Sequence, residues 1–591
     1  MHRSLPLGLA GLLMCIMIFS PAAAAPANGV VGNGTLVSCN EGNLNLALAA
    51  AGTITFNCGG PATITLTSRK TIGQNTTLDG GGIITLTGNL ATSLFLVNPG
   101  IAFTLKDLLL DGGFSDTGPG GAIANHGTLT LQGSTIQNSE TDVTHDGGAI
   151  FSDGPVFISG STLSGNNAGS GGALYANTAG ARLQVENSTF TNNQAFNSVT
   201  GYGGAIWVGP GAQLTMLTPQ LMFNQAEYGG ALYISAGGAV SITAAPSLFS
   251  FFSNRALKNG GAINNQLGGS LFTSGVLLRQ NLATTGTAGI GLGGGIYSAG
   301  PLSLHDTYFQ SNSARFGGGL EFDGLTSGNT PVVLDRNAFG NNLAQISGGG
   351  LYLTGAGTQV TLNSSLVDQN TAKTGAGGGL YRRDARLTII DSSIKDNGAT
   401  AGDGGGLYTT ATGGSGTGGA VQVLDSTITG NSSQGNTRGG GLFNNGAQVN
   451  LRNDTIVENG NGTFNTGAGV ILSTTNSVYW NDGSLNCDDT GPGITSLGGN
   501  YSSDLSCDFA SSHDETNNGV DPLGPRIIDP VDALQALVYY LPKPGSSIIN
   551  TALPVCSLHD QRQALRPDAC DKGAVEFGGL LPRIFVALLS K

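Results

Sequence analysis

The sequence predicts an all-β protein of the right-handed parallel β-helix class, in which short strands wind into coils that stack on one another. Three observations lead to this prediction. An asparagine recurs at a fixed place after an apolar residue, a glycine pair recurs in phase with it, and the segments between them alternate apolar and polar residues without helical periodicity. A short capping helix is expected only near the N-terminal end.

The asparagine repeat occurs in phrases such as NSTFTNN, which begins at Asn187 and in which Asn193 follows Phe190 by three residues. Nine phrases share this pattern, with further apolar residues seven and five positions before the anchor, and two looser phrases fill the remaining gap. The 293 residues from the first asparagine to the last contain ten intervals, so the mean period is about 29 residues. The eleven asparagines are Asn166, Asn193, Asn224, Asn254, Asn281, Asn312, Asn342, Asn370, Asn397, Asn431 and Asn459.

Stacking explains why an amide recurs beside apolar residues. Each inward position faces its own copy in the neighbouring coils, so apolar anchors form columns that fill a narrow interior. An asparagine at a bend tolerates the left-handed region, and its amide can donate to one coil and accept from the other. This satisfies polar groups that would cost about 1–3 kcal/mol each if buried without a partner. Aspartate at these sites would stack like charges.

The glycine pair is a second marker with the same period. It precedes Ala or Gly and then Ile or Leu, and we expect it where the chain turns with positive φ or passes close to the next coil. The twelve pairs begin at Gly120, Gly147, Gly171, Gly203, Gly229, Gly260, Gly293, Gly317, Gly348, Gly377, Gly404 and Gly439.

Strands are indicated by two-residue alternation, as in ARLQVEN, where Leu183 and Val185 stand between polar neighbours. VQV at Val421 and LTI at Leu387 show the same pattern. Intervals between asparagines vary, and we expect the insertions to leave the coil as loops. About thirteen coils at about 4.8 Å per coil would give an axis of roughly 60 Å.

The chain divides into five predicted segments. Residues 1–25, with a short basic start, an apolar run and alanines before Pro26, are expected to be a signal peptide. Residues 26–100 form the N-terminal cap and first coils, with a short amphipathic helix in NEGNLNLALAAAG from Asn40 to Gly52. The repeats occupy 101–480, and a cysteine-containing closure occupies 481–577. Residues 578–591 form a tail too short for a membrane helix, which is either a sorting signal or a final strand.

Six cysteines remain after removal of the predicted signal peptide, in three pairs close in sequence. An exported chain meets an oxidising environment, so the even count favours disulfides over zinc, for which no CxxC or suitably spaced histidine pair is present. The expected pairs are Cys39 with Cys58, Cys487 with Cys507, and Cys556 with Cys570.

Composition limits the partners. Charged residues make up 10% of the chain and the formal net charge is -13, so no basic surface for nucleic acid is expected. Phosphate-binding GK[ST] and metalloprotease HExxH motifs are absent, and we expect no cofactor and no metal. After signal removal we expect no transmembrane helix, and we expect a monomer whose partner is polysaccharide or another cell surface.

The paired markers resemble the repeats of chlamydial-type polymorphic outer membrane proteins, which are described as β-helical surface or secreted adhesin-like proteins. This resemblance covers roughly residues 120–470. The C-terminal DQRQALRPDACDKGAVEF, from Asp560 to Phe577, with VDPLGP near Asp521 and LPKPGSSIIN near Pro544, is similar to the choice-of-anchor domain of bacterial exported β-helix proteins. Together these resemblances imply secretion or display at the cell surface and no particular activity.

Catalysis is the alternative, because pectate lyases and polygalacturonases share the pectin lyase-like β-helix fold. The GHG and RIK signatures of polygalacturonases are absent, and we assign no catalytic residue. The densest charge cluster, with Arg382, Arg383, Asp384 and Arg386, is where a binding groove would be sought, although outward positions on short strands also pair opposite charges.

Two further sets have both a functional and a structural interpretation. Charged residues of the C-terminal motif are either an acid–base set or ion pairs that hold a loop-rich cap, and we favour the second. Aromatic residues near the glycine markers either line a face that stacks on sugars or, as we favour, pack between coils; they are Tyr202, Trp207, Tyr228, Tyr233, Tyr297, Tyr352 and Tyr408. The sequence therefore predicts a secreted or surface adhesin-like rod, with a polysaccharide-binding or polysaccharide-cleaving protein as the alternative.

Overall fold

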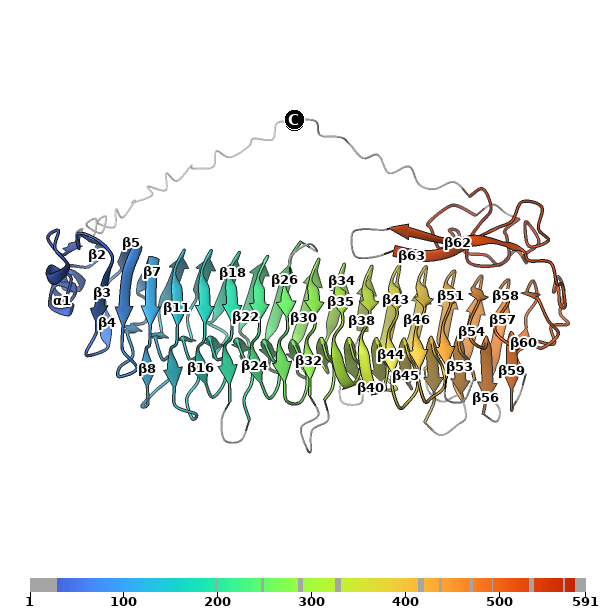
Figure 1. Cartoon of the computed structure of the whole chain (residues 1–591), viewed down its shortest axis with the longest axis horizontal. Coiled ribbons are helices and arrows are strands. Elements are labelled where there is room, and N and C mark those ends of the chain that lie inside the picture. The colour runs from blue at the N-terminus through green and yellow to red at the C-terminus, as the bar shows by residue number, and fades with distance from the viewer. Residues whose placement is uncertain are drawn as a thin grey trace, which may run out of the picture.

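The computed structural model describes residues 29–196, 200–245, 249–284, 291–324, 331–412, 419–434, 438–467, 471–491, 493–530, 536–566 and 569–579. These residues form one elongated right-handed parallel β-helix (Figure 1). The predicted fold class is therefore confirmed. The predicted signal peptide and most of the tail lie outside the described residues.

A typical coil contains four short strands separated by bends. The strands of successive coils form three parallel sheets, called A, B and C. In one coil, β17 (Leu174–Ala176) belongs to sheet B, β18 (Arg182–Glu186) and β19 (Thr189–Thr191) belong to sheet A, and β20 (Gln194–Ala195) belongs to sheet C. Each strand pairs in parallel with its equivalent in the next coil, as β19 does with β23 (Gln220–Met222). Residues that are equivalent in sequence therefore form columns along the axis.

The β-helix is longer than the markers predict. Sheet B contains sixteen strands, from β4 (Lys70–Ile72) to β59 (Cys487–Asp489), where about thirteen coils were expected. The first coils lack the asparagine and glycine markers and use the long strands β5 (Thr76–Thr87) and β7 (Ala102–Asp111). At the other end, parallel pairing in sheet A continues past residue 480 to β61 (Tyr501–Ser502).

Apolar anchors form the interior columns. Leu163, Phe190 and Leu221 are direct partners in consecutive coils and are each fully buried. Farther along the same column, the rings of Phe309 and Phe339 stack with centroids 4.6 Å apart. This burial of apolar surface is the main stabilising contribution of each coil.

The eleven asparagines form a continuous buried ladder beside these anchors. The Oδ1 of Asn193 accepts two hydrogen bonds from Asn166, one from its backbone N–H (3.1 Å) and one from its side-chain Nδ2 (2.9 Å). The Nδ2 of Asn193 donates to Oδ1 of Asn224 in the next coil and to the carbonyl oxygen of Leu163 in the preceding one, each at 3.0 Å. The amide thus joins three coils, and this arrangement repeats along the ladder.

One detail of the asparagine prediction is wrong. The ladder asparagines do not occupy the left-handed region; the residue before each one does, for example Asn192 with φ 55° and Ser311 with φ 56°. The left-handed residue turns the chain, and the asparagine that follows is free to point inward. The amide is therefore selected for its hydrogen bonds and not for its backbone conformation.

A second polar ladder, not predicted from the sequence, follows the bend between the two sheet A strands of each coil. The Oγ of Ser365 accepts from the backbone N–H of Asn337, and the backbone N–H of Ser365 donates to Oγ of Ser392. The series continues through Ser426 to Asp454. Its members differ in type, which explains why no single recurring residue marked it.

The glycine pairs meet two different needs. In the pair Gly203–Gly204, the first residue has φ 65°, and a Cβ on the second would lie 2.1 Å from the carbonyl oxygen of Gly230. All twelve first glycines have positive φ. The marker therefore combines a left-handed turn with a close approach between coils.

Changing Gly318, the second residue of such a pair, to alanine is expected to destabilise the β-helix. Its Cβ would lie 2.3 Å from the carbonyl oxygen of Gly349, so the backbone would have to shift, at a cost of about 1–3 kcal/mol or more. Gly340→Ala is the matched control, because nothing lies within 4 Å of a Cβ there. The urea midpoint should fall for Gly318→Ala alone, and equal midpoints would contradict the close-approach argument.

Helix α1 (Glu41–Ala50) covers the N-terminal end of the β-helix, whereas the C-terminal hairpin packs against its side. The helix is capped by the Asn40 side chain and packs against the first strand β1 (Gly29–Val31). At the other end the antiparallel hairpin of β62 (Leu523–Pro530) and β63 (Ala536–Pro542) lies along the flank of the coils (Figure 1). Within the described part of the chain, no helix has the length and hydropathy of a membrane span.

Three disulfides secure these ends. Cys39 is bonded to Cys58 at the N-terminal cap, Cys487 to Cys507 at the last coils, and Cys556 to Cys570 in the C-terminal segment. The pairs are those close in sequence, as the even count favoured. None of them lies among the central coils, where hydrogen bonds between neighbouring coils hold the chain together.

Candidate functional site

The charged cluster around Arg382 does not form one exposed surface. Arg382 occupies an inward position of β45 (Leu380–Arg383), is fully buried, and donates to the carbonyl oxygen of Thr410 (2.9 Å) and to Oγ1 of Thr409 (3.2 Å). Burial lowers the pKa of its guanidinium to about 10.

The other three members of the cluster point elsewhere. Asp384 is also buried and accepts from the backbone N–H of Thr412, whereas Arg383 is half-buried and Arg386 is exposed. Alternation along β45 sends neighbouring side chains to opposite faces. Because Arg382 and Asp384 are buried and Arg386 is exposed, the four residues do not form one binding surface.

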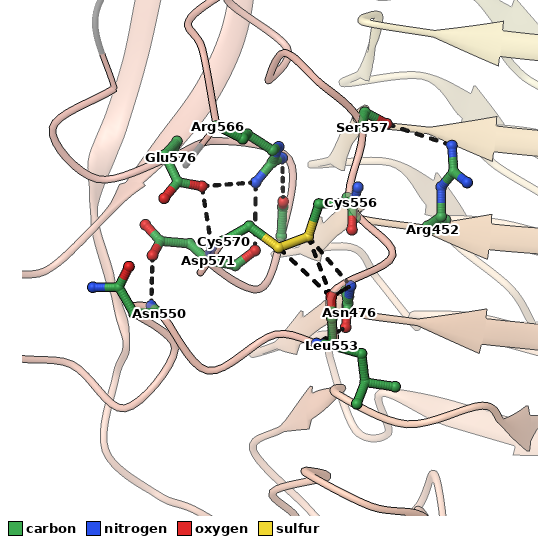
Figure 2. Close-up of a disulfide and its surroundings, with 12 residues drawn as sticks. Arg452, Asn476, Asn550, Leu553, Cys556, Ser557, Arg566, Cys570, Asp571 and Glu576 are labelled. Carbon is green, nitrogen blue, oxygen red and sulfur yellow. Dashed lines mark hydrogen bonds and ion pairs between the residues drawn. A yellow bond between two sulfur atoms is a disulfide. The ribbon is translucent and has the colours of Figure 1, made fainter. Parts of the chain in front are cut away.

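The charged residues of the C-terminal motif are used to attach the cap. The guanidinium of Arg566 lies 3.1 Å from Oδ1 of Asp425, at the bend that follows β50 (Val421–Leu424) of the β-helix, and 3.1 Å from Oε2 of Glu576. Figure 2 shows Arg566 and Glu576 beside the Cys556–Cys570 disulfide. Burial raises the pKa of Glu576 to about 7.

Hydrogen bonds add to this attachment. Gln561 donates to the carbonyl oxygen of Ser392 (3.0 Å) and accepts from Oγ1 of Thr427 (2.6 Å), and Ser393 Oγ bonds the backbone of Val538 in β63. The side chains of the motif are thus engaged with the β-helix or with each other. This arrangement supports the structural interpretation of the motif.

An aromatic ladder lies on the outer face of sheet B. The rings of Tyr352, Tyr381, Tyr408, Phe443 and Phe464 stack with centroid separations of 4.7, 5.1, 5.2 and 4.9 Å and planes within 9° of parallel. Because each ring face contacts the ring of the next coil, the faces that a sugar would cover are occupied. Packing between coils therefore accounts for this ladder.

A carboxylic acid interrupts the same column. Glu321 stands between Tyr297 and Tyr352 in register, and its Oε2 is buried without a hydrogen-bond partner among the described residues. Burial raises its pKa well above the usual range. Burial therefore favours the protonated form of Glu321, which acts as a spacer between the rings.

The remaining candidate is a groove on the outer face of sheet A. Its larger part, about 470 Å³, is lined by uncharged residues of β22 (Gln213–Leu217), β26 (Ala239–Thr243), β30 (Ser270–Ser274), β34 (Leu302–His305) and β38 (Pro331–Asp335). A second part, about 320 Å³, adds β14 (Val156–Ser159) and β18 and shares Gln213 and Thr215 with the first. The groove therefore runs along the axis over seven coils.

The groove combines apolar and hydroxyl-bearing side chains. Phe157 and Phe272 are each 39% exposed in it. Thr215, Ser241, Phe272 and Ser303 form one column on successive strands. Aromatic rings offer apolar faces, and hydroxyl and amide groups bond neutral polar ligands. The groove carries no sequence signal, because its residues occupy ordinary outward positions of alternating strands.

Comparisons with known proteins give a match to the repeat and a similar solved structure. Residues 187–209 match the model of the Chlamydia polymorphic membrane protein (Chlamydia_PMP) repeat. A solved structure of a mutant of the periplasmic alginate epimerase AlgG is similar over 73% of this chain and 78% of that chain, with 10% sequence identity and a TM-score of 0.26. A search of curated proteins gives no match. The repeat match contains Asn193 and the pair Gly203–Gly204.

Proposed function

We propose that the protein is an exported, surface-type β-helix that binds a chain of neutral polysaccharide in the groove of sheet A. The observation that carries this proposal is the axial groove, whose larger part is lined by uncharged side chains at equivalent positions of successive coils. Such a surface suits a linear polymer, because successive sugar units would meet successive copies of similar contacts. A rod of this kind can attach its own cell to another surface or to extracellular glycan.

Export is part of the same proposal. The apolar N-terminal segment, three disulfides and the repeat match all agree with a protein that acts outside the cytoplasm. N-terminal sequencing of the protein recovered from the medium or the cell envelope tests this part, with cleavage expected near Ala25. An intact N-terminus on protein found only in the cytoplasm would contradict it.

Polysaccharide binding is expected to depend on Phe272. Removing this ring should weaken binding about three- to eightfold. Full coverage of a phenylalanine contributes about 1.5–3 kcal/mol, and only the exposed 39% of Phe272 is left for a ligand to cover. A glycan array identifies the polysaccharide, and titration of Phe272→Ala measures the loss. Phe249→Ala is the control, since Phe249 is equally exposed but lies outside the groove lining. Equal affinities of the two variants would place the binding site elsewhere.

A further inference from the structure

Ser303, His305 and Asp335 form a connected network at the edge of the groove. The Oγ of Ser303 lies 3.0 Å from Nε2 of His305, and Nδ1 of His305 lies 3.3 Å from Oδ2 of Asp335. Ser303 and His305 are two residues apart on β34 and so project from the same face, and Asp335 is the direct partner of His305 on β38.

The carboxylate of this network is held in place by further contacts. Asp335 Oδ1 accepts from Nδ2 of Asn363 (2.7 Å), and Oδ2 also accepts from Nη1 of Arg336 (2.5 Å). Arg336 is fixed in turn by two hydrogen bonds to Asp306, of 2.8 and 2.9 Å. On its other side the imidazole of His305 packs near the ring of Phe272, with centroids 5.5 Å apart.

The groups are connected in the order serine, histidine, aspartate, which is the order that activates a serine hydroxyl as a nucleophile. When Nδ1 of His305 carries the proton, it donates a hydrogen bond to Asp335. Nε2 of His305 is then unprotonated and can accept the proton of the Ser303 hydroxyl. His126 and His145 also contact carboxylates through Nδ1, but neither has a hydroxyl at Nε2 among the described contacts. Ser303 is half-buried and lines the groove, so a ligand in the groove can reach its Oγ.

We propose that Ser303, His305 and Asp335 form a catalytic triad that hydrolyses carboxylic esters. The Ser303 Oγ attacks the ester carbonyl carbon while its proton passes to His305 Nε2. The bond to the alcohol oxygen then breaks, and the alcohol leaves with that proton. Water attacks the acyl-serine carbonyl carbon and gives a proton to His305 Nε2. The bond to Ser303 Oγ then breaks, His305 returns that proton to Oγ, and the carboxylic acid is released.

The position of Ser303 indicates the class of ester. Its neighbours in the column are Phe272 and Val333, which leave room for a small acyl group such as acetyl beside a polymer in the groove. The choice of an O-acetylated polysaccharide as substrate rests on the proposed function; the reactivity of the triad does not. The backbone N–H groups of β34 are used in the parallel pairing with the neighbouring strands, so they do not act as oxyanion donors. We therefore expect slow turnover.

The triad is tested on the full mature protein with a fluorophosphonate probe, peptide mass spectrometry and p-nitrophenyl acetate. Ser303 should carry the label, and Ser303→Ala and His305→Gln should each lower ester hydrolysis at least tenfold with unchanged thermal midpoints. Ser164→Ala in β15 (Thr162–Ser164) is the matched control, because Ser164 is half-buried like Ser303 but lies outside the groove lining. An unlabelled Ser303, or hydrolysis by Ser303→Ala equal to the wild-type rate, would overturn the proposal.

A second arm separates this proposal from the polysaccharide proposal. The wild-type protein and Ser303→Ala are each given acetylated xylan, or the same xylan after alkaline deacetylation. Binding and acetate release are measured. Acetate release by the wild type alone supports both proposals. Binding of xylan without acetate release or Ser303 labelling refutes the triad and leaves the binding function intact. Hydrolysis of p-nitrophenyl acetate without binding to any glycan refutes the binding function and leaves the triad intact.

Discussion

Replacing Asn312 by alanine is expected to lower the free energy of unfolding by about 4 kcal/mol or more. The side chain makes four hydrogen bonds of 2.9–3.0 Å: its Oδ1 accepts twice from Asn281, and its Nδ2 donates to the carbonyl oxygen of Leu278 and to Asn342. Alanine leaves the buried backbone N–H of Asn281 and the carbonyl of Leu278 without these partners. Each such group costs about 1–3 kcal/mol.

Urea denaturation followed by circular dichroism measures this effect. Gln345→Ala is the control, because Gln345 is an exposed amide near the end of the next coil. Each coil contacts mainly its two neighbours, so the loss should appear first in the protease sensitivity of the coils around Asn312. If both variants unfold at the same urea concentration, the ladder does not carry the stability assigned to it.

The architecture was predictable because stacking imposes one rule on every coil. Asn312 and the pair Gly317–Gly318 occur in phase because each must meet its own copy in the next coil, and a repeated need produces a repeated residue. The second ladder was not predictable in this way. Its members Ser365, Ser392 and Asp454 all offer an oxygen to a backbone N–H, and several residue types meet that need.

The groove and the network at Ser303 could not be predicted, because they depend on register. Asp335 follows His305 by 30 residues, whereas ladder intervals range from 27 to 34 residues, so no fixed spacing brings the two together. Arg382 illustrates the same limit. A charged residue near a strand end was expected outside. Arg382 instead occupies the third position of β45, in register with the buried Leu353 and Thr409, and backbone carbonyls receive its N–H groups.

Changing Asp482 to asparagine is expected to stabilise the protein at alkaline pH. Asp482 continues the ladder after Asn459, from which its Oδ1 accepts two hydrogen bonds of 2.8 and 2.9 Å. Burial, with smaller contributions from Asp504 and Glu458, raises the pKa of this carboxyl to about 8. A carboxyl is tolerated in the ladder because its neighbours are amides, Asn459 and Asn486, and not a second carboxylate.

The sign of the effect follows from proton binding. Between pH 4 and pH 8 the folded protein keeps a proton on Asp482 that the unfolded chain has released, so stability falls as pH rises. The slope is at most about 1.4 kcal/mol per pH unit for this group. Asparagine removes this contribution. The Oδ2 of Asp482 has no hydrogen-bond partner among the described residues. In Asp482→Asn an Nδ2 group would take its place and, as in the other ladder residues, would donate to a carbonyl of the preceding coil, here that of Ile456.

The measurement compares urea midpoints of the wild type and Asp482→Asn at pH 5 and pH 8.5. Other buried carboxyls, such as Asp391 with a pKa of about 7, act in the same direction, so only the difference between the two proteins reports Asp482. That difference should grow toward alkaline pH, whereas Asp489→Asn, a change at an exposed carboxylate nearby, should show no such growth. A difference independent of pH would mean that Asp482 is ionised in the folded coil. In that case an ionised aspartate would fit the ladder as well as asparagine does. Avoidance of stacked charges would then not explain why eleven ladder positions are asparagine.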